Sequence, residues 1–143
     1  MNNVLVPCIC ENGCMPNYAH ATDAGADLVT NKAVALRPGE RKIVGSGVRI
    51  DVPKGYVALV FPRSGMASKQ GVTLANAVGV IDCGYHGEIG LPLLNIGSFE
   101  VYVRKGTRVA QIVLVPYARM ELAPVDQFEE SERGEGGFGS TGV

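Results

Sequence analysis

The chain has 143 residues, of which 46% are hydrophobic and 19% charged, and its formal net charge is −1. This length suits one domain with a buried core, and the composition excludes a disordered chain. With so little net charge and no basic block, binding to nucleic acid or to an anionic membrane through bulk charge is excluded. No apolar run reaches the roughly 18 residues that span a bilayer, and the start lacks the features of a signal peptide. We therefore expect a cytoplasmic protein without nucleic-acid or membrane partners.

Short runs rich in Val, Ile and Leu alternate with glycine and proline turn signals along the chain. They predict strands at residues 42–51, 56–61, 89–95, 99–103 and 109–117. One short helix is predicted over residues 64–70, because Ser64 is a suitable N-cap and Gly71 a suitable C-terminal stop. Many short strands with one short helix predict an all-β fold, an antiparallel sandwich or jelly roll.

Three of the four cysteines, Cys8, Cys10 and Cys14, lie close together near the N-terminus. Zinc clusters usually match one such group with a second, distant pair of ligands, which this sequence lacks. The favoured alternative is a set of reduced thiols, with Cys8 and Cys10 on one face of a strand.

The composition changes at residue 126, where an acidic stretch over 126–133 leads into a glycine-rich end over 134–143. Such a composition alone is typical of a mobile tail. The tail nevertheless combines a guanidinium, a ring and hydroxyls, which a plain linker does not need, so we favour a tail that orders on a ligand. The predicted division is a β domain over residues 1–132 and a flexible C-terminal lid motif of the same domain over residues 133–143.

A strand-to-helix junction at residues 62–69 (PRSGMASK) is suited to binding phosphate. Arg63, Ser64 and Gly65 offer a cation, a hydroxyl and free backbone N–H groups there. A well-capped helix start with a surface arginine is the alternative, with equal weight. Upstream, residues 24–28 (AGADL) contain Asp27, which is either a turn residue or a carboxylate near a metal or an arginine.

Residues 76–88 (NAVGVIDCGYHGE) predict a β-hairpin with its bend at residues 82–84. The hairpin main chain and the amide of Asn76 could match the acceptor–donor–acceptor edge of uracil. Asp82 could orient a water as a weak base, although a turn-initiating aspartate is the simpler interpretation. Gln111 is either a donor to phosphate or an exposed strand residue. His20 and His86 are isolated in the sequence, so neither is assigned to catalysis.

Taken in order, these segments resemble the five motifs of the trimeric dUTPase family, at residues 24–28, 62–69, 79–88, 106–111 (GTRVAQ) and 133–142 (RGEGGFGSTG). The resemblance extends from about Met15 to the C-terminus. It implies a jelly-roll-like subunit of a homotrimer with three active sites at subunit interfaces. It also implies Mg²⁺-dependent hydrolysis of dUTP to dUMP and pyrophosphate, which supplies dUMP for thymidylate synthesis and keeps uracil out of DNA.

The resemblance further implies a role for each matching residue. Asp82 would activate the water that attacks the α-phosphate, and Tyr85 would pack under the deoxyribose and exclude a 2′-hydroxyl. Uracil would be read by Asn76 and by the backbone of Val80, Ile81 and Asp82. The phosphates would be held by Arg63, Ser64, Gly65 and Gln111. From a neighbouring subunit, Arg133 would reach the γ-phosphate and Phe138 would stack on uracil, with further phosphate contacts from Gly139, Ser140 and Thr141. Mg²⁺ would be held by the triphosphate and waters, with Asp27 in its outer shell.

Two positions depart from common family usage. His86 stands where arginine is frequent, and Gly90 stands where many relatives carry a longer side chain near the base. Two rival functions remain open at this point. A dCTP deaminase would need a glutamate base beside the arginine- and serine-containing motif at Arg63. A non-catalytic nucleotide-binding module could use the same scaffold, because fold does not fix function.

Overall fold

The computed structural model describes residues 3–138, which form eleven strands and one short helix. The first half contains β1 (Cys8–Cys10), β2 (Ala26–Val29), β3 (Val34–Leu36), β4 (Arg41–Gly45), β5 (Val48–Ile50) and β6 (Tyr56–Pro62). The second half contains α1 (Ser64–Gln70), β7 (Val72–Leu74), β8 (Gly79–Ile81), β9 (Gly90–Asn95), β10 (Val101–Val103) and β11 (Arg108–Pro116).

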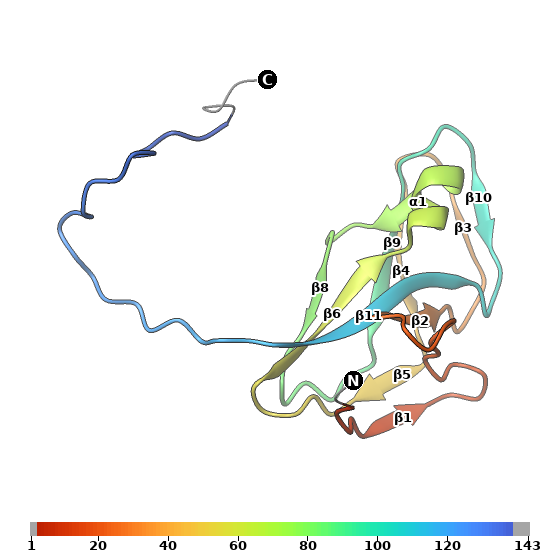
Figure 1. Ribbon diagram of the computed structural model, residues 1–143. Helices are drawn as coiled ribbons and strands as arrows, with labels where there is room; N and C mark the ends of the chain where they lie inside the picture. The colour runs from red at the N-terminus through yellow and green to blue at the C-terminus, as the bar shows by residue number, and fades with distance from the viewer. Residues whose placement is uncertain (1–2, 139–143) are drawn as a thin grey trace.

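The strands form four small sheets, and every pairing is antiparallel (Figure 1). The largest sheet has the strand order β2-β11-β6-β8, and a second has the order β4-β9-β7. Two strand pairs, β1-β5 and β10-β3, complete the body. The predicted all-β, jelly-roll-like antiparallel fold with one short helix is confirmed.

Successive side chains of a strand point to opposite faces of its sheet, and those on the inner faces form the core between the sheets. In β6, Ala58 and Val60 are buried, whereas Val57, Leu59 and Phe61 on the other face are only half-buried. The side chains that fill the interior come from several sheets and include Leu28, Leu36, Val44, Val48, Ile89, Leu91, Leu93 and Val103.

The predicted helix over residues 64–70 is confirmed, and Gly71 ends it in the left-handed conformation with φ 67°. The N-cap, however, is Arg63 and not Ser64, and no side chain caps the helix start. The strand predicted over residues 42–51 is in fact two strands, because the chain breaks between β4 and β5. At that break Gly47 is buried with φ 69°.

The hairpin predicted over residues 76–88 is wrong. Strand β8 pairs with β6, whereas β9 pairs with β4 and β7, so the two strands belong to different sheets. The bend itself is present, since Tyr85 N donates to Asp82 O at 3.1 Å and Gly84 has φ 89°. Residues 82–89 are therefore a connection between sheets rather than the end of one ribbon.

The cysteines are free thiols, and Cys8 and Cys10 lie on one strand as expected. Within residues 3–138, no helix has the length and apolarity needed to cross a membrane.

After β11 the chain leaves the body as an extended arm (Figure 1). Residues 118–138 contain no helix or strand, and nearly all of them are exposed. The large apolar side chains of the arm are not buried against the described body, since Met120, Leu122 and Phe128 are each more than 80% exposed.

Gly47 supports a test of this packing. A Cβ placed there would lie 2.7 Å from Cys14 Sγ, whereas one placed at Gly39, which has φ 75°, would meet nothing within 4 Å. We expect Gly39→Ala to cost about 1 kcal/mol of unfolding free energy from backbone strain alone. Gly47→Ala should cost at least about 1 kcal/mol more because of overpacking. Chemical denaturation of both variants measures the difference, and equal costs would contradict the tight contact with Cys14.

Candidate active site

Three neighbouring strands bring one carboxylate between two guanidinium groups. Asp27 on β2 accepts from Arg63 Nε at 2.9 Å and from Arg108 Nη1 at 3.2 Å, one arginine on each carboxylate oxygen. The Asp27 side chain is only 12% exposed, whereas those of Arg63 and Arg108 are 31% and 56% exposed. Arg63 Nη1 also donates to Arg108 O at 3.2 Å. Asp27 thus orients both guanidinium groups, while part of each arginine remains exposed to solvent. This arrangement is suited to binding a phosphate.

Gln111 joins this cluster from β11, where it is the register partner of Asp27. Its Nε2 donates to Pro62 O at 3.2 Å, just before Arg63. Gly25 lies against the same side chain, since a Cβ there would stand 2.6 Å from Gln111 Oε1. Ser64 and Gly65 follow at the exposed start of α1. The structure therefore brings Asp27, Arg63, Ser64, Gly65 and Gln111 together, and we call this group the phosphate cluster.

The predicted base-reading residues lie at the other edge of the same sheet. Among residues 3–138, strand β8 pairs with β6 alone and is the edge strand of this sheet, so within this part of the chain one side of its backbone is open to bond a ligand. Val80 on this strand is 56% exposed. A tight turn precedes β8, in which Val78 N donates to Asn76 O at 2.6 Å and Ala77 adopts φ 60°. Such strain in a non-glycine residue is typical of turns that fix a functional group, here Asn76.

Asp82 and Tyr85 occupy the turn that follows β8. Asp82 is exposed, and its carbonyl accepts from Tyr85 N. The Tyr85 hydroxyl donates to Glu88 O at 3.0 Å, which holds the ring against Gly87, where any side chain would collide with it. Tyr85 is 46% exposed, so part of its ring presents a flat surface to solvent, three residues after Asp82. Asn76, Val80, Ile81, Asp82 and Tyr85 form what we call the nucleoside edge.

The structure does not bring the phosphate cluster and the nucleoside edge of one chain together. Ile81 pairs with Ala58, so Asp82 lies beside the first residues of β6, whereas Arg63 follows its last residue. At about 3.3 Å per residue, the six residues from Val57 to Arg63 separate these positions by roughly 20 Å along the strand. One bound nucleotide therefore cannot have its attacked phosphorus next to Asp82 and its outer phosphates on Arg63 of the same chain.

Two of the C-terminal candidates, Arg133 and Phe138, lie on the arm that extends away from the body (Figure 1). Arg133 Nε donates to Gly136 O at 2.8 Å within the arm, and Phe138 is fully exposed. Gly139, Ser140 and Thr141 lie outside the described residues.

Two contributors to the phosphate cluster were missed from the sequence. Arg108 belongs to the same short motif as Gln111, but nothing in the sequence indicates that it pairs with Asp27, 81 residues earlier. Gly25 is the second, because its lack of a side chain makes room for Gln111. The spacing of Arg108 and Gln111 on one strand was the signal that could have indicated Arg108.

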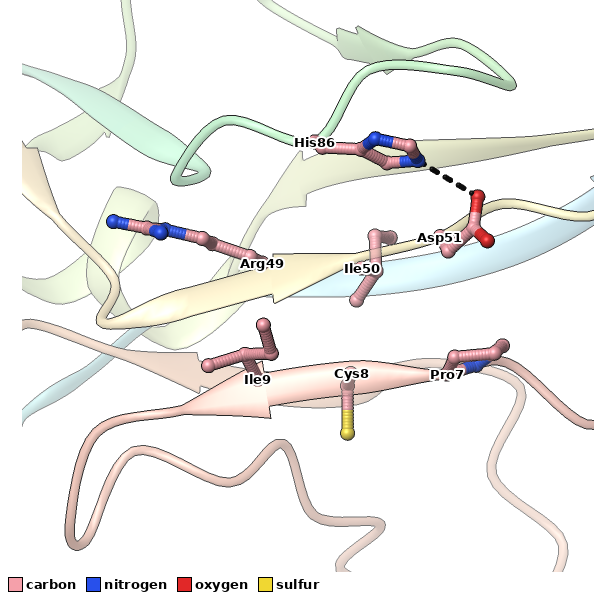
Figure 2. Close-up of a pocket in the computed structure, with 7 residues that line it drawn as sticks. All are labelled: Pro7, Cys8, Ile9, Arg49, Ile50, Asp51 and His86. Atoms are coloured by element: carbon pink, nitrogen blue, oxygen red, sulfur yellow. Dashed lines mark hydrogen bonds and ion pairs between the residues drawn. The ribbon is translucent and has the colours of Figure 1, made fainter.

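His86 lies on the connection after Tyr85, and its Nε2 is 3.0 Å from Asp51 Oδ1. Both side chains line a pocket of about 160 Å³ with Arg49, Ile50, Pro7, Cys8 and Ile9 (Figure 2). A larger hollow of about 520 Å³ includes Asn76 and is lined otherwise by Arg41, Lys42, Ile43, Ala75 and Pro92. The predicted site residue Asn76 therefore lines a concave surface together with the cationic side chains of Arg41 and Lys42.

The described residues offer no protein cage for a metal, since none of their His, Cys, Asp and Glu side chains gather in a group of three that could hold one. Asp27 is the carboxylate nearest to the phosphate-binding side chains, and both of its oxygens face arginines. This donor set does not suit a directly bound Mg²⁺. It does suit an ion that keeps its waters and is carried by a triphosphate, with one carboxylate nearby.

Comparison with known proteins identifies the chain, since the family model described as dUTPase matches residues 11–142. The chain belongs to the dUTPase family. As a member it is a hydrolase, and the curated relatives it matches carry the name deoxyuridine 5′-triphosphate nucleotidohydrolase. The one from Cutibacterium acnes is 46% identical over 144 residues, covering 100% of this chain and 95% of the relative. The one from Bifidobacterium longum subsp. infantis is 51% identical over 134 residues, covering 93% and 85%.

Solved dUTPase structures have the same fold. A Staphylococcus bacteriophage 80alpha dUTPase with dUpNHpp superposes with a TM-score of 0.90 at 33% identity, covering 99% of this chain and 100% of that chain. A D95N mutant dUTPase from phage phi11, described with a structural Mg(II) ion, gives 0.80 at 29% identity, covering 89% and 100%. With the family settled, dUTP hydrolysis is favoured over dCTP deamination and over a purely binding module.

The ion pairs of this dUTPase-family chain predict the effect of Asp27→Asn. The amide keeps the shape but removes the charge that orients two guanidiniums, so the freed arginines should bind triphosphate in misaligned positions. We expect kcat to fall by about tenfold or more, as for other residues that support a metal or phosphate site, while KM for dUTP does not rise. Asp23→Asn is the matched control, because Asp23 only accepts from His20 N in an exposed turn. A rise in KM at constant kcat would contradict the orienting role.

Proposed function

We propose that the chain hydrolyses dUTP at composite sites, each built from the phosphate cluster of one chain and the nucleoside edge of another. Water attack on the α-phosphate would give dUMP and pyrophosphate. Asp82 would orient the water through its carboxylate oxygens. The observation that carries the proposal is the roughly 20 Å that β6 puts between Asp82 and Arg63 within one chain, by its length and rise per residue.

The assembly proposed is the homotrimer that the family resemblance implies. A half-exposed apolar face on β6 and β11, contributed by Val57, Leu59, Phe61, Val113 and Val115, supports association. Contiguous apolar surface of this kind is typical of an interface between subunits. Closed cyclic symmetry would then give every phosphate cluster a nucleoside edge from a neighbour.

The division of roles follows from the chemistry of each half. The free backbone of β8 and the Asn76 amide would read uracil, and the fixed Tyr85 ring would pack under the sugar and leave no room for a 2′-hydroxyl. Arg63, Ser64 and Gln111 would hold the phosphate oxygens, whose charge grows in the transition state. Mg²⁺ carried by the triphosphate would neutralise part of that charge, with Asp27 in its outer shell. We place this reaction in the cytoplasm, which the four free thiols also favour.

The arm would complete the site. Residues 118–138 are exposed and extended, and at about 3.3 Å per residue such a segment can reach a neighbouring subunit. Residues 133–143 would act as the lid, with Arg133 on the γ-phosphate, Phe138 stacked on uracil and Gly139, Ser140 and Thr141 on the phosphates. A lid that closes after binding excludes stray water and completes the catalytic constellation late.

Pyrophosphate release from dUTP with Mg²⁺ tests the activity, and Asp82→Asn tests the base. Because the amide cannot accept a proton, kcat should fall by about 100-fold or more. Binding of dUpNHpp, measured by calorimetry, should change little, since Asp82 would not hold the phosphates. Asp51→Asn is the control, because Asp51 contacts His86 on the same connection, residues 82–89, but is not a predicted site residue. Near-normal turnover of Asp82→Asn would overturn the assignment.

Mixed trimers test the composite site. Chains with Asp82→Asn and chains with Arg63→Ala should each be nearly inactive alone. If the two halves come from different chains, random mixing in equal amounts restores about a quarter of the sites of a closed trimer. If one chain supplied both halves, every site in the mixture would be defective. Co-refolding the two variants and measuring pyrophosphate release separates these cases, and no recovery in verified mixed trimers would contradict the proposal.

A further inference from the structure

Three sulfur atoms converge near the N-terminus, outside both halves of the proposed active site. The thiols of Cys8 and Cys10 both point to Met15 Sδ, at 4.0 Å and 3.7 Å. The two cysteines lie two residues apart on β1, so their side chains share one face of that strand. Figure 2 shows the Cys8 side chain directed away from His86 and Asp51.

A short turn returns the chain so that Met15 lies over β1. Cys14 N donates to Glu11 O at 3.0 Å, Gly13 has φ 79°, and Glu11 N donates to Gly47 O at 2.8 Å. Cys14 is 3% exposed and fixes the turn against Gly47 instead of joining the surface group. Main-chain hydrogen bonds and the packing of Cys14 therefore fix the positions of the three sulfur atoms, and no bond between these atoms is needed.

The sulfur spacing fits the coordination sphere of a soft metal ion. With metal–sulfur bonds of about 2.3 Å, two sulfur ligands stand roughly 3.8 Å apart at a tetrahedral angle and roughly 4.0 Å apart at a trigonal angle. The spacings from Met15 Sδ to the two thiols, 4.0 Å and 3.7 Å, are within about 0.1 Å of these values. Access is open from solvent, because Cys8 is exposed and Met15 is 62% exposed.

We propose that Cys8, Cys10 and Met15 form a binding site for one soft monovalent cation, Cu(I). Thiolate and thioether ligands select Cu(I), which is satisfied by two or three of them. Zinc suits the site less well, because a structural zinc closes its shell with four nitrogen, thiolate or carboxylate ligands. The described part of the chain contains no group of three such side chains positioned for a metal.

A bound metal would displace the thiol protons of Cys8 and Cys10 as it forms its sulfur bonds.

Titration of the reduced full chain with Cu(I), without oxygen and in competition with the Cu(I) chelator bicinchoninate, tests the site. We expect one chelator-resistant Cu(I) per chain, with only sulfur in its first shell by X-ray absorption. Cys8→Ser and Cys10→Ser should each abolish this binding. Met15→Leu should weaken it by at least about tenfold, since even residues that only support metal ligands contribute that much. Cys83→Ser, which removes another exposed thiol, should leave it intact.

Three results would overturn the proposal: equal loss in Cys8→Ser and Cys83→Ser, unchanged affinity in Met15→Leu, or nitrogen and oxygen in the first shell. Thermal melting checks that each variant is folded. Cys8 and Met15 are exposed, so their variants remain informative if Cys10→Ser is unstable. Failure here would leave dUTP hydrolysis untouched, because none of these residues belongs to either half of the active site.

Discussion

The registered pairing of β6 with β11 on one side and β8 on the other is the constraint on which the site depends. It buries Ala58 and Val60 and turns Val57, Leu59 and Phe61 outward, so a slip of one residue would exchange the core face with the outer face. The same register puts Arg63 at one end of β6 and Asp82 near the other. A strand that is well paired on both sides cannot bend to close this gap. The proposed composite site would therefore need a second chain, and the outward apolar face offers a surface on which that chain could pack.

Electrostatics at the phosphate cluster follow from the same sheet. Two guanidiniums share one carboxylate, which leaves about one positive charge at this point of a chain whose net charge is −1. A triphosphate is thus attracted by a few placed groups. This agrees with the composition, because a chain with a net charge of −1 has no bulk positive field. Because Asp27 is largely covered and the arginines are not, a phosphate can approach the guanidiniums from solvent while the carboxylate stays behind them.

Elements whose formation depends on neighbouring residues were predicted correctly from the sequence. Strand β6 was recognisable as an apolar run after a turn, and the helix over 64–70 as a segment that ends at a glycine. The error over residues 76–88 shows the limit of such signals. Two strands joined by a turn give the same local pattern whether they pair with each other or with strands of different sheets, and only distant partners decide. The pairing of Asp27 with Arg108 is equally non-local. The site residues were predicted from the order of five motifs, and that order contains no information on how far apart the residues lie in one chain.

Gly47 connects the N-terminal sulfur group with the nucleoside edge. Its missing side chain admits Cys14, and with it the turn that holds Met15. Its backbone N–H donates to Glu88 Oε1 at 2.8 Å, and the carbonyl of Glu88 accepts from the Tyr85 hydroxyl. Both contacts need the chain to pass Gly47 with positive φ, which only glycine adopts without strain. The break between β4 and β5 that the sequence pattern concealed is therefore a structural requirement. It lets one buried backbone position support the turn over β1 on one side and Tyr85 of the nucleoside edge on the other.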